Sequence, residues 1–285
     1  MRQPGAGATA AADQYEWRRR SELNVLAWPA FDHYEIDAFV TTRGGGTSLG
    51  SYSSLNLGLH VGDDDAHVMR NRTRVADTLS VSLDDFVFCD QAHRSNVSIV
   101  TDEHRGRGAH ACADAIPDTD ALVTVVPGIV LMVMVADCVP LVLYDPVAGI
   151  LSCVHAGWRG TVRGVTPAAV RTMCQLGSDP RNIIAGLGPA ITPERNQVGQ
   201  DVVDAATAAF GDRVEEVIRP DGTGKWTFDL WRANALQLSA AGVPWEKAHL
   251  AAIGTGPGTP FFSHRAESPC GRIALAARIR EQGSL

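Results

Sequence analysis

The sequence has few cysteines and no long apolar run, and each shortage excludes a class of protein. Its six cysteines are scattered and form no Cys-x-x-Cys pair, which argues against a disulfide framework and for a reducing, cytoplasmic location. The longest apolar run is broken by Asp137, short of the roughly 18 residues that span a bilayer. We therefore expect no membrane segment.

Positive charge is also scarce. The 25 basic residues include only two lysines and face 32 acidic residues, which gives a net charge of -7. Such a balance argues against a surface built to bind nucleic acid or an anionic membrane. With 45% hydrophobic residues in 285, the chain can bury an ordinary globular core.

The first 20 residues lack the apolar stretch of a secretory signal, because small residues precede the arginines. We expect residues 1–22 to form a flexible tail. No internal repeat or Pro/Ser linker interrupts the rest, so residues 23–285 are expected to form a single domain. A monomer is favoured, although no sequence feature determines the oligomeric state.

Runs of β-branched and apolar residues predict strands, and apolar residues at helical spacing predict helices. The expected strands are 36–41, 97–100, 121–126, 129–135, 141–144, 150–154 and 183–185. The expected helices are 65–79, 162–176, 201–210, 230–240 and 271–281. Short turns between the central strands favour antiparallel or mixed pairing, so we expect an α/β sandwich of mixed sheets with outer helices.

A predicted hairpin brings a cysteine and a histidine together. The connection "PVAG" suits a hairpin, and pairing Asp145 with Ile150 across it places Pro140 opposite His155. Cys138 then becomes the diagonal neighbour of His155, about 7–8 Å away between backbones. Three interpretations remain open: two ligands of one zinc ion, a cysteine nucleophile with a histidine base, or a buried cysteine beside a hydrogen-bonded histidine.

The loop after His155 contains glycines and an arginine. Gly157 and Gly160 allow close approach of the backbone to a ligand, and the following helix points its N-terminal amides towards the site. Arg159 is then placed to bind an anion such as phosphate. The alternative is a loop that only needs flexible residues.

Several motifs, in order, resemble the laccase-domain family, also called the YfiH or multicopper polyphenol oxidoreductase family. The resemblance covers residues from about 24 to 280. It rests on "TTRGGGTS", "SLNLGLHVGDD", "DQAHRSNV", "DALVT", "ADCVP", "HAGWRGT", "GLGPAI", "FDLWRAN" and "FFSHR".

The resemblance implies a four-layer α/β/β/α sandwich of mixed sheets and a zinc site made by His93, Cys138 and His155. It also implies phosphorolysis of adenosine, inosine, guanosine and methylthioadenosine, with adenosine deamination. Three protein ligands leave a fourth position open, as in catalytic rather than structural zinc sites. Zinc there would activate water for attack on a purine ring carbon.

Further residues are candidates for contacts to nucleoside and phosphate. Arg43 and Arg159 are expected to bind phosphate or ribose, with Arg72 a third candidate, although each could instead form a structural ion pair. Gln91 and Asn56 are candidate hydrogen-bond partners of the nucleoside.

Asp137 is expected to orient a ligand histidine or to act as an acid or base, unless it only caps a turn. The remaining histidines, among them His60 and His264, are expected to be ordinary surface or loop residues. His264 replaces the tyrosine usual in the family pattern, so it could border the pocket.

Other functions use the same residues. Cys138 and His155 would also suit a cysteine or zinc hydrolase, for which the family resemblance implies a peptidoglycan precursor as substrate. A protein that binds a nucleotide or a cell-wall precursor without catalysis is a third class. A copper-dependent polyphenol oxidoreductase is less favoured, because the nine histidines form no His-x-His pair. Departures from the family pattern, such as Ala190 for cysteine and Arg94 for glycine, bear on substrate preference and leave the proposed ligands intact.

Overall fold

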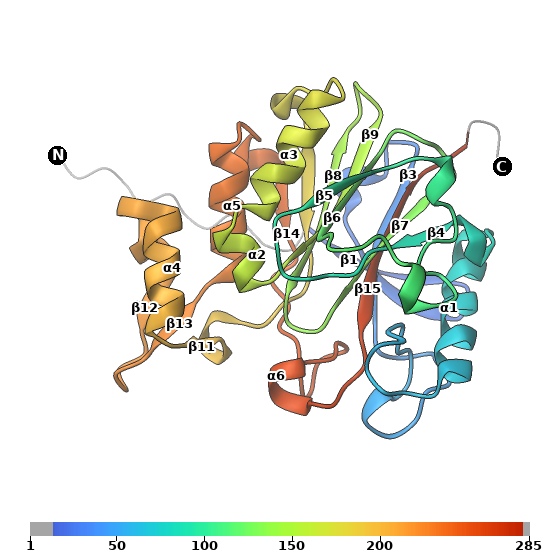
Figure 1. The fold of residues 1–285 in the computed structure, drawn as a ribbon, viewed down its shortest axis with the longest axis horizontal. Helices are drawn as coiled ribbons and strands as arrows, with labels where there is room; N and C mark the ends of the chain where they lie inside the picture. Colours follow the sequence, from blue (N-terminus) through green and yellow to red (C-terminus); the bar gives the residue numbers. More distant parts are fainter. Residues whose placement is uncertain (1–13, 282–285) are drawn as a thin grey trace.

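The computed structural model describes residues 14–281, in which two six-stranded sheets lie face to face between helices (Figure 1). The first sheet contains, in spatial order, β1 (Glu16–Arg20), β2 (Leu23–Ala27), β3 (Ile36–Thr41), β15 (Ile273–Ile279), β7 (Val130–Val135) and β4 (Phe86–Phe88). Only β4 and β7 pair in parallel within it, so this sheet is mixed.

The second sheet is also mixed. It contains, in spatial order, β14 (Ala248–Leu250), β10 (Ile184–Leu187), β8 (Val139–Asp145), β9 (Ile150–Ala156), β6 (Ala121–Thr124) and β5 (Val97–Val100). The outermost pair at each edge is parallel and the inner pairs are antiparallel. The mixed pairing agrees with the expectation, but only the short turn from β8 to β9 joins neighbours within this sheet; the short connections from β6 to β7 and from β7 to β8 cross between the two sheets.

Helices cover the outer faces of both sheets. α1 (Asp65–Leu79) packs on the first sheet, whereas α3 (Val165–Gln175) and α5 (Leu230–Ala240) pack on the second, next to the short α2 (Trp158–Val162). The remaining elements are α4 (Gln200–Phe210), α6 (His264–Glu267) and a small sheet of β11 (Gln197–Val198), β13 (Trp226–Phe228) and β12 (Ile218–Pro220). The predicted four-layer α/β/β/α sandwich is confirmed.

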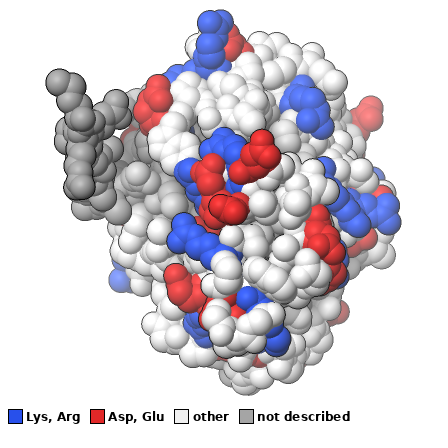
Figure 2. All heavy atoms as spheres, turned by 90° about the vertical axis from the view of Figure 1, so that its left-hand side faces the viewer, with Lys and Arg blue, Asp and Glu red and all other residues white. Residues whose placement is uncertain are grey.

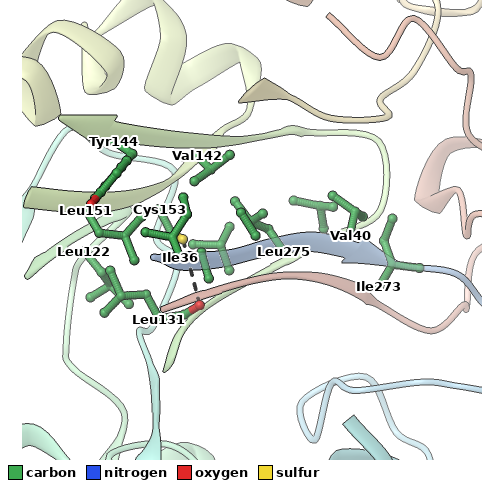
Figure 3. Close-up of a cluster of buried hydrophobic side chains, with 14 of the residues drawn as sticks. Ile36, Val40, Leu122, Leu131, Val142, Tyr144, Leu151, Cys153, Ile273 and Leu275 are labelled. Atoms are coloured by element: carbon green, nitrogen blue, oxygen red, sulfur yellow. Dashed lines mark hydrogen bonds between the residues drawn. The ribbon is translucent and has the colours of Figure 1, made fainter. Parts of the chain in front are cut away.

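The largest buried cluster lies between the two sheets. Figure 3 shows side chains of β3 and β15, such as Val40 and Leu275, facing Val142 and Leu151 of the second sheet. Cys153 lies in the same layer and donates its thiol hydrogen to the Leu131 carbonyl, at 3.8 Å. Removing this apolar surface from water stabilises the pairing of the sheets by about 25 cal/mol per Å².

The expected helix at 271–281 is wrong, because these residues form β15 in the middle of the first sheet. Ile273 and Leu275 face the core between the sheets, whereas Ala274 and Ala276 face α1. A strand buried on both faces has no polar alternation, so its Ala-rich, continuously apolar sequence is compatible with a helix as well.

Two boundaries also differ from expectation. Residues 16–20 of the expected tail form β1, an edge strand paired with β2, because Trp17 stacks on Phe261 and anchors it; residues 1–13 of that tail lie outside the described residues. The helix expected at 162–176 begins three residues later, as α3 at Val165, because Gly164, whose φ of 78° suits a left-handed turn, separates it from the preceding α2.

Two features of the described residues concern membranes and nucleic acids: the apolarity of the helices and the charges on the surface. Within residues 14–281, no helix combines the length and apolarity needed to cross a membrane. Figure 2 shows acidic and basic side chains interspersed on the side of the molecule that carries α4. For the residues described, that face has no continuous basic surface of the kind that binds a nucleic-acid backbone.

Candidate metal centre

The hairpin of β8 and β9 has the register that the sequence predicted. Asp145 pairs with Ile150 and Pro140 pairs with His155. Cys138 precedes the first residue of β8 and so lies at the end of the sheet, beside His155. Two of the expected ligands are therefore held by central strands of the second sheet.

His93 completes a group of three metal-ligating side chains with Cys138 and His155. One ligand atom from each lies within 4.8 Å of the other two. Cys138 Sγ lies 3.8 Å from His93 Nε2, and the two imidazole rings have centroids 4.7 Å apart at an interplanar angle of 80°. Two imidazole nitrogens and one thiolate form a donor set that fits Zn²⁺ and leaves one tetrahedral position for a small ligand.

Asp120, which the sequence analysis did not assign, holds two of these ligands. Its buried carboxylate accepts hydrogen bonds from His155 Nδ1 at 2.8 Å, from the His93 amide at 3.0 Å and from the Arg94 amide at 2.6 Å. The bond to Nδ1 leaves Nε2 of His155 directed at the group, the usual arrangement of a carboxylate behind a metal-binding histidine. The acid at the start of "DALVT" was the available signal.

The backbone around the ligands is constrained. His93 has a φ of 58°, in the left-handed region that non-glycine residues rarely adopt, and its carbonyl accepts a hydrogen bond from Arg163 Nη1. A Cβ at Gly157 would lie 2.8 Å from both Cys138 Sγ and His93 Cδ2. Only glycine at this position therefore allows the three ligands to approach one another.

Within this group, the pKa values of Cys138 and His155 are shifted from their ordinary values. Burial raises the pKa of the Cys138 thiol, but the charges and hydrogen bonds of His155 and His93 outweigh burial and lower that pKa. Burial lowers the pKa of His155, whereas the Cys138 charge and the hydrogen bond to Asp120 raise it above its ordinary value. The thiolate that results is the form of cysteine that binds metals and attacks electrophiles.

The three ligands line a cavity of about 540 Å³. This volume lies within the range of about 300–1,000 Å³ typical of small-molecule sites. We call the part next to the ligands the metal end; it includes Trp158, Arg159 and Ile191. The guanidinium of Arg159 lies 4.3 Å from the centroid of the Trp158 ring and forms no ion pair or hydrogen bond with any described residue, so it is available to a ligand.

The opposite part, which we call the α1 end, includes His60, Arg72 and Arg272. These residues come from α1 and from loops on the side of the first sheet, whereas Trp158 and Arg159 begin α2 on the side of the second sheet. His60, expected to be an ordinary loop residue, therefore lines the cavity. His264 lines it as well, as the departure from the family tyrosine suggested.

Asp137 lines the cavity but does not orient a ligand histidine, a function that belongs to Asp120. Its carboxylate accepts hydrogen bonds from Thr255 Oγ1 at 2.5 Å and from the Arg265 amide at 2.6 Å. Asp137 thus caps the first turn of α6, the simpler of the expected roles.

Two residues expected to bind substrate are engaged elsewhere. Arg43 pairs with Glu267 at 2.9 Å and stacks on Phe262, and it does not line the cavity. The structural ion pair considered from the sequence is therefore the observed one. Asn56 is fully buried, where its Oδ1 accepts hydrogen bonds from the Gly58 and Arg272 amides. It organises the loops of the α1 end and has no exposed group for a nucleoside.

The other two expected substrate residues do line the cavity. Arg72 is 1% exposed and donates to three backbone carbonyls, those of Leu57, Gly108 and Ala109. The Gln91 side-chain amide both donates to and accepts from the Met134 backbone, which leaves one amide hydrogen for a ligand.

This chain is similar in sequence to several known proteins. A sequence model described as multi-copper polyphenol oxidoreductase laccase matches residues 37–280. Purine nucleoside phosphorylase YlmD of Geobacillus stearothermophilus is 39% identical over 250 residues, which is 86% of this chain and 90% of the relative. Adenosine deaminase RL5, from an unknown prokaryotic organism, is 42% identical over 209 residues, which is 73% of this chain and 80% of the relative.

Solved structures show the same fold. The hypothetical protein YfiH of Bacillus licheniformis superposes with a TM-score of 0.88 at 33% identity, and YlmD of Geobacillus stearothermophilus with 0.88 at 36%. Each superposition covers 93% of this chain and 99% of the other.

Proposed function

This chain belongs to the multi-copper polyphenol oxidoreductase laccase family, and we propose that it is a zinc-dependent purine nucleoside phosphorylase that also deaminates adenosine. Its substrates would be adenosine, inosine, guanosine and methylthioadenosine, together with phosphate. The observation that carries the proposal is the open donor set of His93, Cys138 and His155 in the wall of a nucleoside-sized cavity. The names of two relatives, a purine nucleoside phosphorylase and an adenosine deaminase, support it.

Phosphorolysis forms a bond between a phosphate oxygen and ribose C1′ and breaks the bond from C1′ to purine N9, with a proton passing to the purine. The chain must therefore hold an anion, orient the ribose and supply or relay that proton. At the metal end, Arg159 can stabilise negative charge that develops on the departing purine, and Asp137 can relay a proton. Gln91 can donate its remaining amide hydrogen to the nucleoside.

For deamination, water replaces the exocyclic amine of adenosine at ring carbon C6. A bound zinc ion would supply a Lewis acid that makes water a nucleophile near neutral pH. His93, Cys138 and His155 would hold the ion, with Asp120 fixing the tautomer of His155. The apolar side chain of Ile191 also lines the cavity.

The direct test is incubation of the purified protein with inosine and phosphate, followed by measurement of hypoxanthine and ribose 1-phosphate. We expect both products in equal amounts, and we expect His93→Ala to abolish them. Absence of products with a zinc-loaded protein, or their persistence in His93→Ala, would contradict the proposal. The accompanying metal analysis should find one zinc and no copper per chain.

A cysteine hydrolase is the second candidate, because Cys138, His155 and Asp120 are arranged as a nucleophile, a base and a carboxylate behind the base. Its substrate would be an amide or ester of a peptidoglycan precursor. The two candidates differ in their need for metal. A chelated, zinc-free protein that hydrolyses such a precursor and loses activity on alkylation of Cys138 would favour the hydrolase.

We further propose that the protein is a monomeric, single-domain enzyme of the cytoplasm. The six cysteines are all free thiols in the structure, which supports a reducing compartment. Size-exclusion chromatography with light scattering tests the monomer directly.

A further inference from the structure

Two arginines, Arg72 and Arg272, line the α1 end of the cavity, and the charges of Asp65 and Asp114 reach Arg72 only at longer range. Within residues 14–281, neither Arg72 nor Arg272 forms an ion pair with a carboxylate. Asp90 is the acidic residue that lines this end, and it is exposed. An arginine that lines a cavity without a carboxylate partner is well placed to bind an anionic ligand.

Arg72 is the more deeply buried of the two cations. Three carbonyls accept hydrogen bonds from its Nε and Nη1, while the nearest partner of Nη2 is the Met134 sulfur, 4.0 Å away. Carbonyls satisfy donors but carry no net charge, so burial lowers the pKa of Arg72 to about 10. An anion at the α1 end would offset this cost.

Arg272 and His60 complete the α1 end. Arg272 donates from Nη1 to the carbonyls of Cys270 and Gly271, and its Nε and Nη2 have no partner among the described residues. His60 lies close to it, since a Cβ at Gly58 would be 3.0 Å from Arg272 Cγ and 3.3 Å from His60 Cε1. Because Gly58 has no side chain, the side chains of Arg272 and His60 can both lie against its backbone.

The shape of a purine nucleoside indicates that phosphate is the reactant that would meet these arginines. In a purine nucleoside, C6 and N9 lie on opposite edges of the ring system, so a nucleoside that presents C6 to the three ligands directs its ribose away from them. The ribose then points towards the α1 end, where an anion could reach C1′. We propose that His60, Arg72 and Arg272 form the phosphate subsite, an assignment that rests on the proposed function.

The test compares Arg272→Met with Arg70→Met, which removes an exposed arginine from α1 and serves as the control. We expect Arg272→Met to raise the KM for phosphate about tenfold or more, because a charge-assisted hydrogen bond is lost. Deamination of adenosine needs no phosphate, so the ratio of phosphorolysis to deamination should fall by a similar factor. His60→Ala should shift the same KM in the same direction, by less.

Calorimetric titration with inorganic phosphate separates this proposal from the proposed function. If the wild type does not phosphorolyse inosine but binds phosphate, and Arg272→Met weakens that binding, the subsite stands and the phosphorylase assignment fails. If the wild type is an active phosphorylase and Arg272→Met leaves the phosphate KM and binding unchanged, the subsite is overturned. A raised phosphate KM in Arg159→Met alone would place the anion at the metal end.

Discussion

The two ends of the cavity differ in how their charges are balanced. At the metal end, the Cys138 thiolate faces His155, and Asp120 neutralises the histidine from behind. At the α1 end, Arg72 and Arg272 have only neutral partners among the described residues. The first arrangement is held together by the protein itself and suits a cation, whereas the second is completed only by an anionic ligand.

The largest effect should come from removing the thiolate. Cys138→Ala deletes one of three ligands, so zinc should be lost and turnover should fall by roughly a thousandfold, the equivalent of several kcal/mol of transition-state stabilisation. Elemental analysis and the inosine assay measure both. The matched control is Cys174→Ala, a partly buried cysteine on α3 that should keep its zinc. Retention of zinc by Cys138→Ala would contradict the ligand assignment.

The second-largest effect is expected at Asp120, the carboxylate that accepts a hydrogen bond from the ligand His155. Asp120→Asn removes the charge that supports His155 and one acceptor of the His93 and Arg94 amides, so zinc affinity should fall about 10- to 100-fold. Competition with a chromophoric chelator gives the affinity. Asp118→Asn changes a nearby exposed acid that pairs with Arg94, and its zinc affinity should not change. Equal affinities in both variants would mean that Asp120 has only a structural role.

A smaller effect is expected at the α1 end. Arg72→Met removes donors from three carbonyls but also removes a buried, uncompensated charge, so the free energy of unfolding should fall by about 2 kcal/mol. Urea denaturation measures this, with exposed Arg70→Met as the control within about 0.5 kcal/mol. Added phosphate should stabilise the wild type against urea but not Arg72→Met. Equal stabilisation of the wild type and of Arg72→Met by phosphate would contradict the assignment of an anion site to the α1 end.

The smallest effect is expected from a substitution away from the cavity, at a buried carboxylate that is paired with two arginines. Asp37 is buried and accepts hydrogen bonds from Arg20 and Arg278. Burial raises its pKa, but these two arginines outweigh burial and lower it below the ordinary value. A lowered folded-state pKa means that Asp37 stabilises the fold fully above about pH 4 and loses this contribution as the pH falls further.

Asp37→Asn should therefore lower the free energy of unfolding by about 1 kcal/mol at pH 7, with a smaller difference from the wild type below pH 4. Urea unfolding at several pH values measures the change. Zinc content and the phosphate KM should stay as in the wild type. A variant whose deficit grows on acidification would show that the sign of the pKa shift is wrong.

Features of the fold that depend on local sequence patterns could be predicted from the sequence. The β8–β9 register follows from a four-residue turn, which is why the proximity of Cys138 and His155 could be predicted. His93 lies 45 residues before Cys138 and has no local signal; it came from the family resemblance. Asp120 was missed because a single acid before a buried strand has no periodicity, and its role depends on which strand lies beside it.

The remaining errors have a tertiary cause. β15 is apolar on both faces because it has one sheet neighbour on each side, a second sheet in front and α1 behind. Arg43 was expected at the substrate because it lies in a glycine-rich loop. Such loops are equally typical of tight packing, as at Gly46, where a Cβ would lie 2.1 Å from the Ser54 carbonyl oxygen.

The central position of β8 and β9 has a consequence for how the protein exchanges its metal. Both strands have hydrogen-bonded neighbours on each side, so their amides should exchange with deuterium only when the whole domain opens. Two ligands are thus attached to the slowest-exchanging part of the chain, while His93 is carried by a loop. We expect zinc to leave and return through motion of that loop, so the chelated protein should stay folded and regain its metal without refolding.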